Sequence, residues 1–408
     1  MKIRISLALL LILGVLSPQS AESAIKNVPV KAMVQITSLL PTDQVSGLLV
    51  KGKTLYLFGS SQGSVNNDGF IRAIDDAGTV IWSLTLDTGV DEIASSASLD
   101  SSGNIWVFGS AATAQGAPIS ASPTPGGLNP DGVVLDPEVT LRSDLTVLTA
   151  WKISPAGQLL ATISRDMKSP ILVQASVVTS PKLAVVGITT SAKGTIGFVS
   201  QSLDSQSFTE PLLVGVSDTS FNGVMRKSDG NLIVVGGSSE TIAGKKSQGL
   251  RDGVIATISS SNKIIALVRS ANQQSLRNWF SVSKTIFLGG DVTLAGKVQA
   301  VVTKFGNTLA PTWTTRLPST GPALTINTSA TSNAMVFSST STIPGISQWK
   351  ASKGAVIALL FGANGAITQA FSATGLISPI GLAYSTDLGL VVLGSSATGV
   401  SIFHALTR

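Results

Sequence analysis

Residues 55–59 read Leu-Tyr-Leu-Phe-Gly, and residues 68–86 read DGFIRAIDDAGTVIWSLTL. The first stretch is an apolar run that ends in glycine. The second holds two further apolar runs, and the turn residues Asp-Asp-Ala-Gly separate them. Short runs rich in β-branched and aromatic residues, bounded by turn signals, predict β-strands, and nearly continuous apolarity is typical of strands buried on both faces. This part of the chain therefore predicts three consecutive strands of one sheet.

The apolar run of residues 55–59 recurs along the chain. Its seven copies begin at Leu55, Ile105, Leu183, Leu232, Thr285, Ala334 and Leu390, and their successive spacings are 50, 78, 49, 53, 49 and 56 residues. Glycine ends every copy except one, where Ser338 stands instead. Four strands of about six residues with their turns need roughly 40–50 residues, which is one propeller blade. We therefore expect an all-β, seven-bladed β-propeller of four-stranded blades, with each copy as the second strand of its blade.

The two ends of the chain predict how this ring closes. The last copy is followed by one further strand, near residues 400–406, and no residues remain for a fourth. Residues 32–39, AMVQITSL, resemble the outer-strand sequence VIWSLTL of residues 80–86. We expect the segment around Gln35 to pair with the strand that holds Phe403, so that an N-terminal strand completes the C-terminal three strands and removes an open edge.

The unit DGFIRAIDDAGTVIWSLTL, followed by SSASLDSSGNIWVFGS at residues 95–110, resembles the repeat of bacterial secreted seven-bladed propellers of the SBBP and delta-60 type. The likeness is clear in the first repeat and near Asp252, and thin near Gly187 and Ser338. The resemblance implies a propeller outside the cytoplasm. It transfers no catalytic residues.

The N-terminus predicts export. Residues 1–24 read as a signal peptide, because two basic residues precede the apolar run Ile5–Leu16 and small residues follow it, with cleavage near Ser23. The run is too short to cross a bilayer, and no later segment is long enough, so we expect a secreted or cell-envelope protein. Residues 25–408 then form a single propeller domain, expected as a monomer. The chain has no cysteine, which excludes disulfides and thiolate sites.

The long second interval places an insertion at about residues 111–144. It is rich in Pro, Gly, Ala and Ser, and it holds Asp131, Asp136 and Glu138. Long loops in compact domains are often functional, although a tolerated surface insertion is equally ordinary.

Two further loops between second and third strands carry cations. Lys245, Lys246 and Arg251 fall in one of them, and Trp349, Lys350 and Lys353 fall in the other. On one rim these cations would attract a carboxylated glycan, a wall polymer or an acidic protein. The alternative is ordinary solvated charge on a chain with formal net charge +6. The Trp349 ring would serve sugar stacking if exposed, and the alternative is packing against its own loop.

Catalytic patterns are weak. Residues 59–63, Gly-Ser-Ser-Gln-Gly, match a nucleophile elbow, but no helix is predicted after them and Gly-Ser-Ser recurs in other repeats. His404 is the sole histidine, which leaves histidine base chemistry and multi-histidine metal sites little support. The acidic pairs Asp75-Asp76 and Asp91-Glu92 read as solvated turn and loop residues. We therefore expect no catalytic residue and no cofactor.

Calcium-loop spacing is absent as well. Its nearest approaches are residues 66–69, Asn-Asn-Asp-Gly, and residues 129–132, Asn-Pro-Asp-Gly, and both read as turns. No metal site is expected, and nucleic acid is not expected as a partner because cations are sparse. The leading hypothesis is a non-enzymatic binding or scaffolding propeller for a protein or an anionic envelope polysaccharide. The alternative is a glycan hydrolase or lyase that uses loop carboxylates, whose separation would decide between the two.

Overall fold

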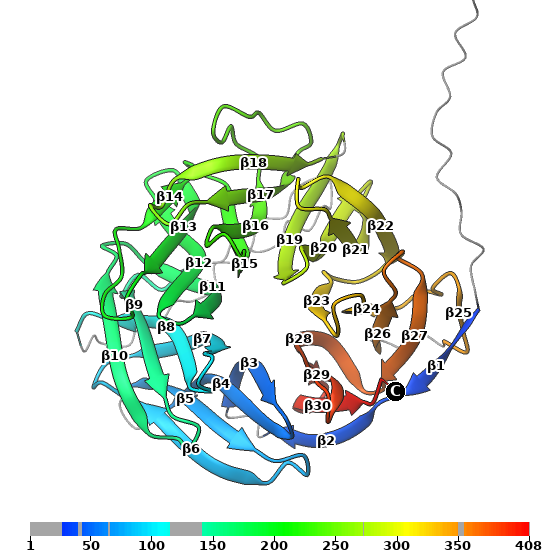
Figure 1. Ribbon diagram of the computed structural model, residues 1–408, viewed down its shortest axis with the longest axis horizontal. Helices are drawn as coiled ribbons and strands as arrows, with labels where there is room; N and C mark the ends of the chain where they lie inside the picture. The colour runs from blue at the N-terminus through cyan, green and yellow to red at the C-terminus, as the bar shows by residue number, and fades with distance from the viewer. Residues whose placement is uncertain are drawn as a thin grey trace, which may run out of the picture.

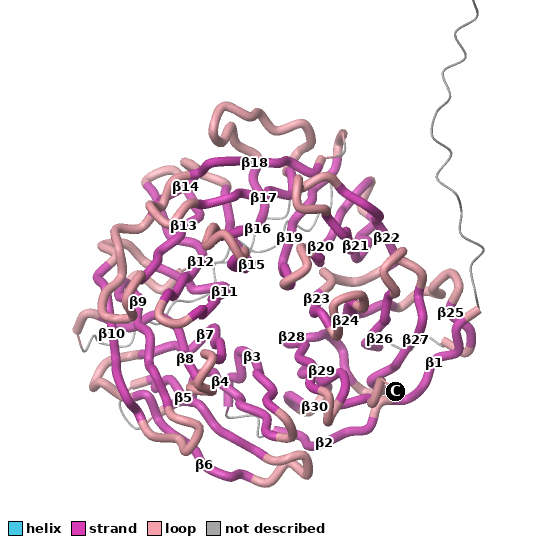
Figure 2. Tube along the Cα trace, viewed as in Figure 1, coloured by secondary structure: helices cyan, strands magenta, loops and turns pink. Residues whose placement is uncertain are grey.

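The computed structural model describes residues 27–39, 43–63, 66–114, 141–271, 273–349 and 355–407. Within these ranges the regular elements are strands, and they surround a central axis as a ring (Figures 1 and 2). The innermost strands are the first of their sheets, and outer strands such as β6, β10 and β22 line the periphery (Figure 1). No helix in the described part of the chain is long and apolar enough to span a membrane. The chain is a β-propeller.

Six sheets have four strands each. They are β3 (Asp43–Lys51), β4 (Thr54–Gln62), β5 (Asn67–Ile74) and β6 (Val80–Leu86); β7 (Glu92–Leu99), β8 (Ile105–Ala112), β9 (Leu145–Ile153) and β10 (Leu159–Asp166); β11 (Ile171–Thr179), β12 (Lys182–Ser191), β13 (Gly194–Ser202) and β14 (Leu212–Val214); β15 (Thr219–Arg226), β16 (Leu232–Ser238), β17 (Asp252–Ile258) and β18 (Ile264–Ser270); β19 (Ser275–Ser283), β20 (Phe287–Leu294), β21 (Lys297–Phe305) and β22 (Pro311–Pro318); and β28 (Leu376–Ser385), β29 (Gly389–Ser396), β30 (Gly399–Ala405) and β2 (Val34–Leu39).

The expectation of seven equal four-stranded blades needs a correction, because six blades have four strands and the remaining sheet has six. That sheet runs in the order β23 (Leu324–Asn327), β24 (Asn333–Ser339), β26 (Ala355–Phe361), β27 (Ile367–Ala373), β1 (Val28–Ala32) and β25 (Ile346–Ser347). β1 lies parallel to the outer strand β27, and β25 lies parallel to β1. Parallel pairing to a distant segment leaves no local signal in the sequence, so this addition was not predicted.

The ring is continuous around its axis. β2 pairs antiparallel with β30, and Gln35 lies opposite Phe403, which is the pairing that the chain ends predict. The first strands of neighbouring sheets contact one another in ring order, including β28 with β3. The N-terminal segment 28–39 therefore joins two sheets, because β1 lies on the outside of one and β2 completes the next (Figure 1).

The repeated glycine has a structural cause. In the first two repeats the first strand bulges opposite Gly59 and Gly109, and a Cβ on either glycine would clash with a backbone carbonyl of that strand. In the fifth repeat this position is Gly290 and not the predicted Gly289. Ser338 lies beyond the pairing of β24 with β23, which ends where Leu324 lies opposite Val336, so no bulge of β23 lies opposite Ser338. The Ser338 hydroxyl lies 2.7 Å from that of Thr320.

The core lies between adjacent sheets. Second strands such as β8 and β16 are buried at every residue, and Trp151 of β9 packs in one cluster with Tyr56 and Phe58 of the preceding sheet. Trp106, Trp151 and Trp279 are buried in this core. Trp82 and Trp313 lie on outer strands and are only partly buried.

Strand order gives the ring two distinct faces. We call the side with the β4–β5, β8–β9, β16–β17 and β24–β26 connections the loop face, and it also carries the connections between successive sheets. The opposite side, with the β15–β16, β19–β20 and β21–β22 connections, is the turn face.

Candidate functional site

The predicted cations of the β16–β17 loop divide into two kinds. Lys245 and Lys246 are exposed on the loop face, and the Lys245 ammonium donates a hydrogen bond to the carbonyl of Leu267 at 2.7 Å. Arg251 lies just before β17, and its side chain is only 14% exposed. The two lysines are therefore available to a partner, whereas Arg251 is largely covered.

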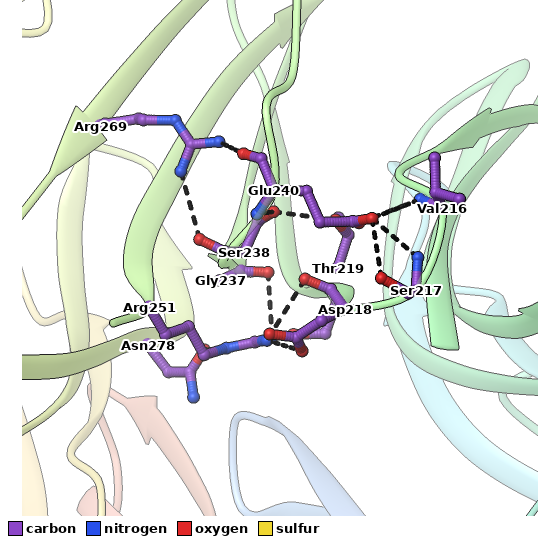
Figure 3. A network of polar contacts seen from close by, with 11 residues as sticks. Val216, Ser217, Asp218, Thr219, Gly237, Ser238, Glu240, Arg251, Arg269 and Asn278 are labelled. Carbon is purple, nitrogen blue, oxygen red and sulfur yellow. Dashed lines mark hydrogen bonds and ion pairs between the residues drawn. The ribbon is translucent and has the colours of Figure 1, made fainter. Parts of the chain in front are cut away.

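Arg251 is bound within the protein (Figure 3). Its guanidinium donates to Asn278 Oδ1 at 2.9 Å, to Ser220 Oγ at 2.9 Å and to the carbonyl of Gly237 at 3.0 Å, and it forms an ion pair with Asp218. These groups come from both the β15–β18 sheet and the following β19–β22 sheet. Arg251 therefore holds two neighbouring sheets together.

Glu240 completes the same network from the β16–β17 loop (Figure 3). Its carboxylate accepts hydrogen bonds from the backbone N–H groups of Val216 and Ser217, at 2.9 and 2.8 Å, and from the Thr219 hydroxyl at 2.7 Å. Burial by itself would raise the pKa of Glu240, but these hydrogen bonds outweigh it and lower the pKa to about 2. The ionised carboxylate therefore ties the loop to the connection between two sheets.

The ring of Trp349 is 9% exposed, and its Nε1 donates to the carbonyl of Ser341 at 2.9 Å. It packs against its own loop, which is the alternative to sugar stacking. Other predicted site residues lie outside the described residues. They are Lys350, Lys353, Asp131, Asp136 and Glu138.

The two candidate catalytic residues, Ser60 and His404, both lie within β-strands. Ser60 is buried within strand β4, and β5 follows it after a short connection, so the Gly-Ser-Ser-Gln-Gly motif is not followed by a helix. The Nδ1 atom of His404 on β30 lies 3.2 Å from the carbonyl oxygen of Leu388. Neither residue has the surroundings of a nucleophile or a general base.

Three carboxylates converge on the loop face, between the β3–β6 and β7–β10 sheets. Oxygen atoms of Asp68, Asp87 and Glu92 all lie within 4.8 Å of one another. Burial raises the pKa of Glu92 to about 7 against the opposing hydrogen bonds from Thr88, and Asp87 and Asp68 raise it further. Burial and the charges of Asp87 and Asp91 also raise the pKa of Asp68.

The prediction that Glu92 is a solvated loop residue was wrong, because its side chain is fully buried. In the sequence Asp91 and Glu92 are simply two adjacent acidic residues, but in the structure their surroundings differ. Asp91 accepts from the backbone of Asn67 at 2.8 Å and pairs with Arg142. Alternation along β7 could have indicated that Glu92 points inward, since Glu92 and Ala94 lie on the same side of the strand.

A pocket of about 520 Å³ lies on the turn face, where the β15–β18 and β19–β22 sheets meet. Its cationic lining residues are Arg226, Lys227, Lys284 and Lys304, and its apolar lining residues are Met225, Ile286 and Phe305. The cations come from two neighbouring sheets and are up to 78 residues apart in sequence, from Arg226 to Lys304. The predicted site cations all belong to loop-face connections, and no sequence pattern links the residues of this pocket, so the pocket was not predicted.

The pocket is positively charged. Lys227 pairs with Asp229 at 2.9 Å, and among the described residues it is the only one of the four cations with an ion pair. Burial lowers the pKa of Arg226 and of Lys304. The guanidinium of Arg226 donates to the carbonyl oxygens of Gly230 and Leu183, and the Lys304 ammonium donates to that of Thr285, so both keep their charge at the pocket without an acidic partner in the described part of the chain. Lys284 is exposed. This arrangement suits an anionic group.

Comparisons with known proteins show the fold. Neither a family model nor a curated protein matches this chain. The hydrazine synthase of Kuenenia stuttgartiensis is similar in structure, with 9% identity, 91% of this chain and 98% of that chain covered, and a TM-score of 0.51. A structure described as YCF48 bound to D1 peptide has 11% identity, 93% and 98% coverage, and a TM-score of 0.51. An ulvan lyase of polysaccharide lyase family PL25 has 8% identity, 92% and 95% coverage, and a TM-score of 0.47.

At these identities the likeness establishes a β-propeller with repeated blades and nothing finer. The resemblance to SBBP and delta-60 repeats is accordingly supported at the level of the propeller fold.

Proposed function

We propose that this chain is a non-enzymatic binding propeller whose turn-face pocket accepts acidic side chains of a protein partner. The observation that carries the proposal is the group of four cations around one pocket, only one of which has an ion-pair partner among the described residues. A volume of about 520 Å³ lies within the range of small-ligand pockets and accommodates one or two carboxylate side chains.

A protein segment fits this pocket better than a uniform polyanion does. Part of the lining is apolar, since it includes Met225, Ile286 and Phe305, and an acidic peptide offers apolar stems beside its carboxylates. A similar propeller has been solved with a D1 peptide bound. The charges would steer the partner toward the turn face, so binding should weaken with salt.

Binding of a fluorescent hexaglutamate peptide to residues 25–408 tests this function. We expect saturable binding that weakens as salt rises, and about a tenfold loss in the variant Lys284→Glu, since one reversed charge in a partly desolvated pocket changes binding by about 1.4 kcal/mol or more. The matched control is Lys246→Glu, which reverses an exposed lysine on the loop face. Equal losses in both variants would show non-specific attraction and contradict the proposal.

The alternative of a glycan hydrolase or lyase gains no support from the described residues. Their one cluster of three potential ligand carboxylates includes the fully buried Glu92, which a polymer could not reach. Incubation with polygalacturonate provides the test, because release of reducing or unsaturated ends would favour the enzyme over the binding protein.

We further propose that the protein acts outside the cytoplasm after removal of residues 1–24. The support is the basic start and the apolar run Ile5–Leu16, both outside the described residues. N-terminal sequencing of the chain from the extracytoplasmic fraction tests this expectation, and an intact Met1 there would contradict it.

A further inference from the structure

Three carboxylates meet on the loop face without a compensating cation. Asp68 is the second residue of β5, Asp87 follows β6, and Glu92 begins β7. Among the described residues, none of the three forms an ion pair, and the nearby Arg142 is bound to Asp91 and Asp144. Like charges so close together repel strongly in a partly buried place.

Two oxygen atoms of this cluster have no partner. Glu92 Oε1 accepts from the backbone N–H of Thr88 at 2.9 Å, but Glu92 Oε2 is buried without a hydrogen bond in the described structure. The Oδ1 atom of Asp68 is likewise buried and unpartnered. A buried carboxylate oxygen without a donor is costly, so a group that the chain does not supply is needed beside them.

In another repeat, the aspartate equivalent to Asp68 is compensated by residues of the chain itself. Asp252, the first residue of β17, is equivalent to Asp68 of β5. Each aspartate precedes a glycine and lies opposite a serine of the second strand. Asp252 is fully buried, accepts from the backbone N–H groups of Gln248 and Gly249 at 3.0 and 2.9 Å, and pairs with Arg269 at 3.2 Å.

In the first repeat, a neutral and an acidic residue stand at two positions that arginines occupy in and beside the sheet of Asp252. By strand register, Thr85 occupies the place of Arg269, since each pairs with the residue two after its aspartate. Glu92 occupies the place of Arg277, because each lies two residues before the last paired residue ahead of the bulge in its first strand, Ala94 in β7 and Trp279 in β19. The junction of the β15–β18 and β19–β22 sheets therefore has Arg269 and Arg277 where the junction of the β3–β6 and β7–β10 sheets has Thr85 and the carboxylate of Glu92.

We propose that Asp68, Asp87 and Glu92 bind one calcium ion, which supplies the positive charge that Arg269 supplies to Asp252 in the β15–β18 sheet. Calcium takes carboxylate oxygens at 2.3–2.6 Å, so two of its ligands lie at most about 5 Å apart, and the separations within this cluster satisfy that limit. The ion ties the connection between β6 and β7 to the β4–β5 hairpin, and so joins two neighbouring sheets.

Calcium titration of the whole mature chain tests the site. At pH 7.5 we expect one Ca²⁺ per chain by calorimetry and a rise in Tm when CaCl2 replaces EDTA at constant ionic strength, because a ligand that binds only the folded state stabilises it. Glu92→Gln and Asp68→Asn should each weaken binding by at least about tenfold.

Two further variants keep the test decisive. Asp87 is exposed, so Asp87→Asn should fold normally and still weaken calcium binding, whereas Asp387→Asn removes an exposed carboxylate elsewhere and should leave it unchanged. A wild-type chain whose Tm does not respond to Ca²⁺ would overturn the proposal. So would an equal response in wild type and Asp87→Asn. Absence of a calcium response together with a loss of stability as the pH rises from 5 through 7 would instead assign a shared proton to the cluster.

Discussion

Buried or partly buried carboxylates on the loop face are stabilised in different ways. Asp252 has an arginine, and Glu240 has backbone and hydroxyl donors, whereas Glu92 has one satisfied and one unsatisfied oxygen. The direction of each resolved pKa shift follows from these surroundings, since the pKa of Glu240 falls to about 2 and that of Glu92 rises to about 7. Residue type alone does not determine the charge state, because donors from other strands do.

Replacing Glu240 by Gln tests its stabilising role. Its folded-state pKa lies below the ordinary value, so the stabilisation is present above about pH 4.5 and is lost as the pH falls toward 2. We expect Glu240→Gln to lower the free energy of unfolding at pH 7 by about 1–2 kcal/mol, a figure reduced for partial exposure, and to have a smaller effect at pH 3. Urea unfolding at both pH values measures this.

The control for that measurement is Asp387→Asn, which changes an exposed carboxylate that forms no hydrogen bond among the described contacts. It should leave the pH dependence as in the unsubstituted chain. A Glu240→Gln variant with undiminished acid sensitivity would show that other carboxylates cause it.

At the level of elements, the N-terminal segment is unusual because its two strands serve different sheets. β1 adds to β27 through three residue pairs, outside a sheet that already has four strands. β2 is the fourth strand of its own sheet and covers the edge of β30. An uncovered edge offers unpaired backbone groups to other chains, so β2 is the more consequential of the two.

Two truncations separate the contributions of these strands. Removing residues 1–32 takes away β1 and keeps β2, and we expect a small decrease in Tm. Removing residues 1–39 also exposes the edge of β30, so we expect a larger decrease in Tm and concentration-dependent association. Differential scanning calorimetry and light scattering measure these changes. Equal behaviour of the two truncations would contradict the closing role of β2.

For the whole molecule, burial falls from the second strand of each sheet to the outer strand. Every residue of β16 is buried, whereas most residues of β10 are exposed. Opening of an outer strand needs few broken contacts, while exposure of a second strand requires separation of neighbouring sheets.

Hydrogen–deuterium exchange should therefore follow this radial gradient. We expect amides of Leu232–Ser238 in β16 to exchange far more slowly than those of Leu159–Asp166 in β10. Mass spectrometry of peptides from both strands measures the difference. Similar protection of the two strands would mean that the ring opens only as one unit.

The candidate sites were less predictable than the fold. The turn-face pocket joins Arg226 to Lys304, and the carboxylate cluster joins Asp68 to Glu92, across sheet boundaries. Predictions on residues 115–140 and 350–354, which include Asp131 and Lys353, lie outside the described residues and stay predictions. Hydrophobic spacing says nothing about which polar residues of different blades meet, because polar side chains contribute little to the periodic signal.

The propeller and the position of its second strands were predictable from the sequence, because apolar runs at a regular spacing have to be buried between neighbouring sheets. The partner of β2 was predictable because residues 32–39 resemble an outer strand. Three features became visible only in the folded ring: β1 and β25 enlarge one sheet, Arg251 is bound within the protein, and Glu92 is buried beside two aspartates. These features depend on contacts between residues of different sheets, and such contacts arise only when the ring is closed.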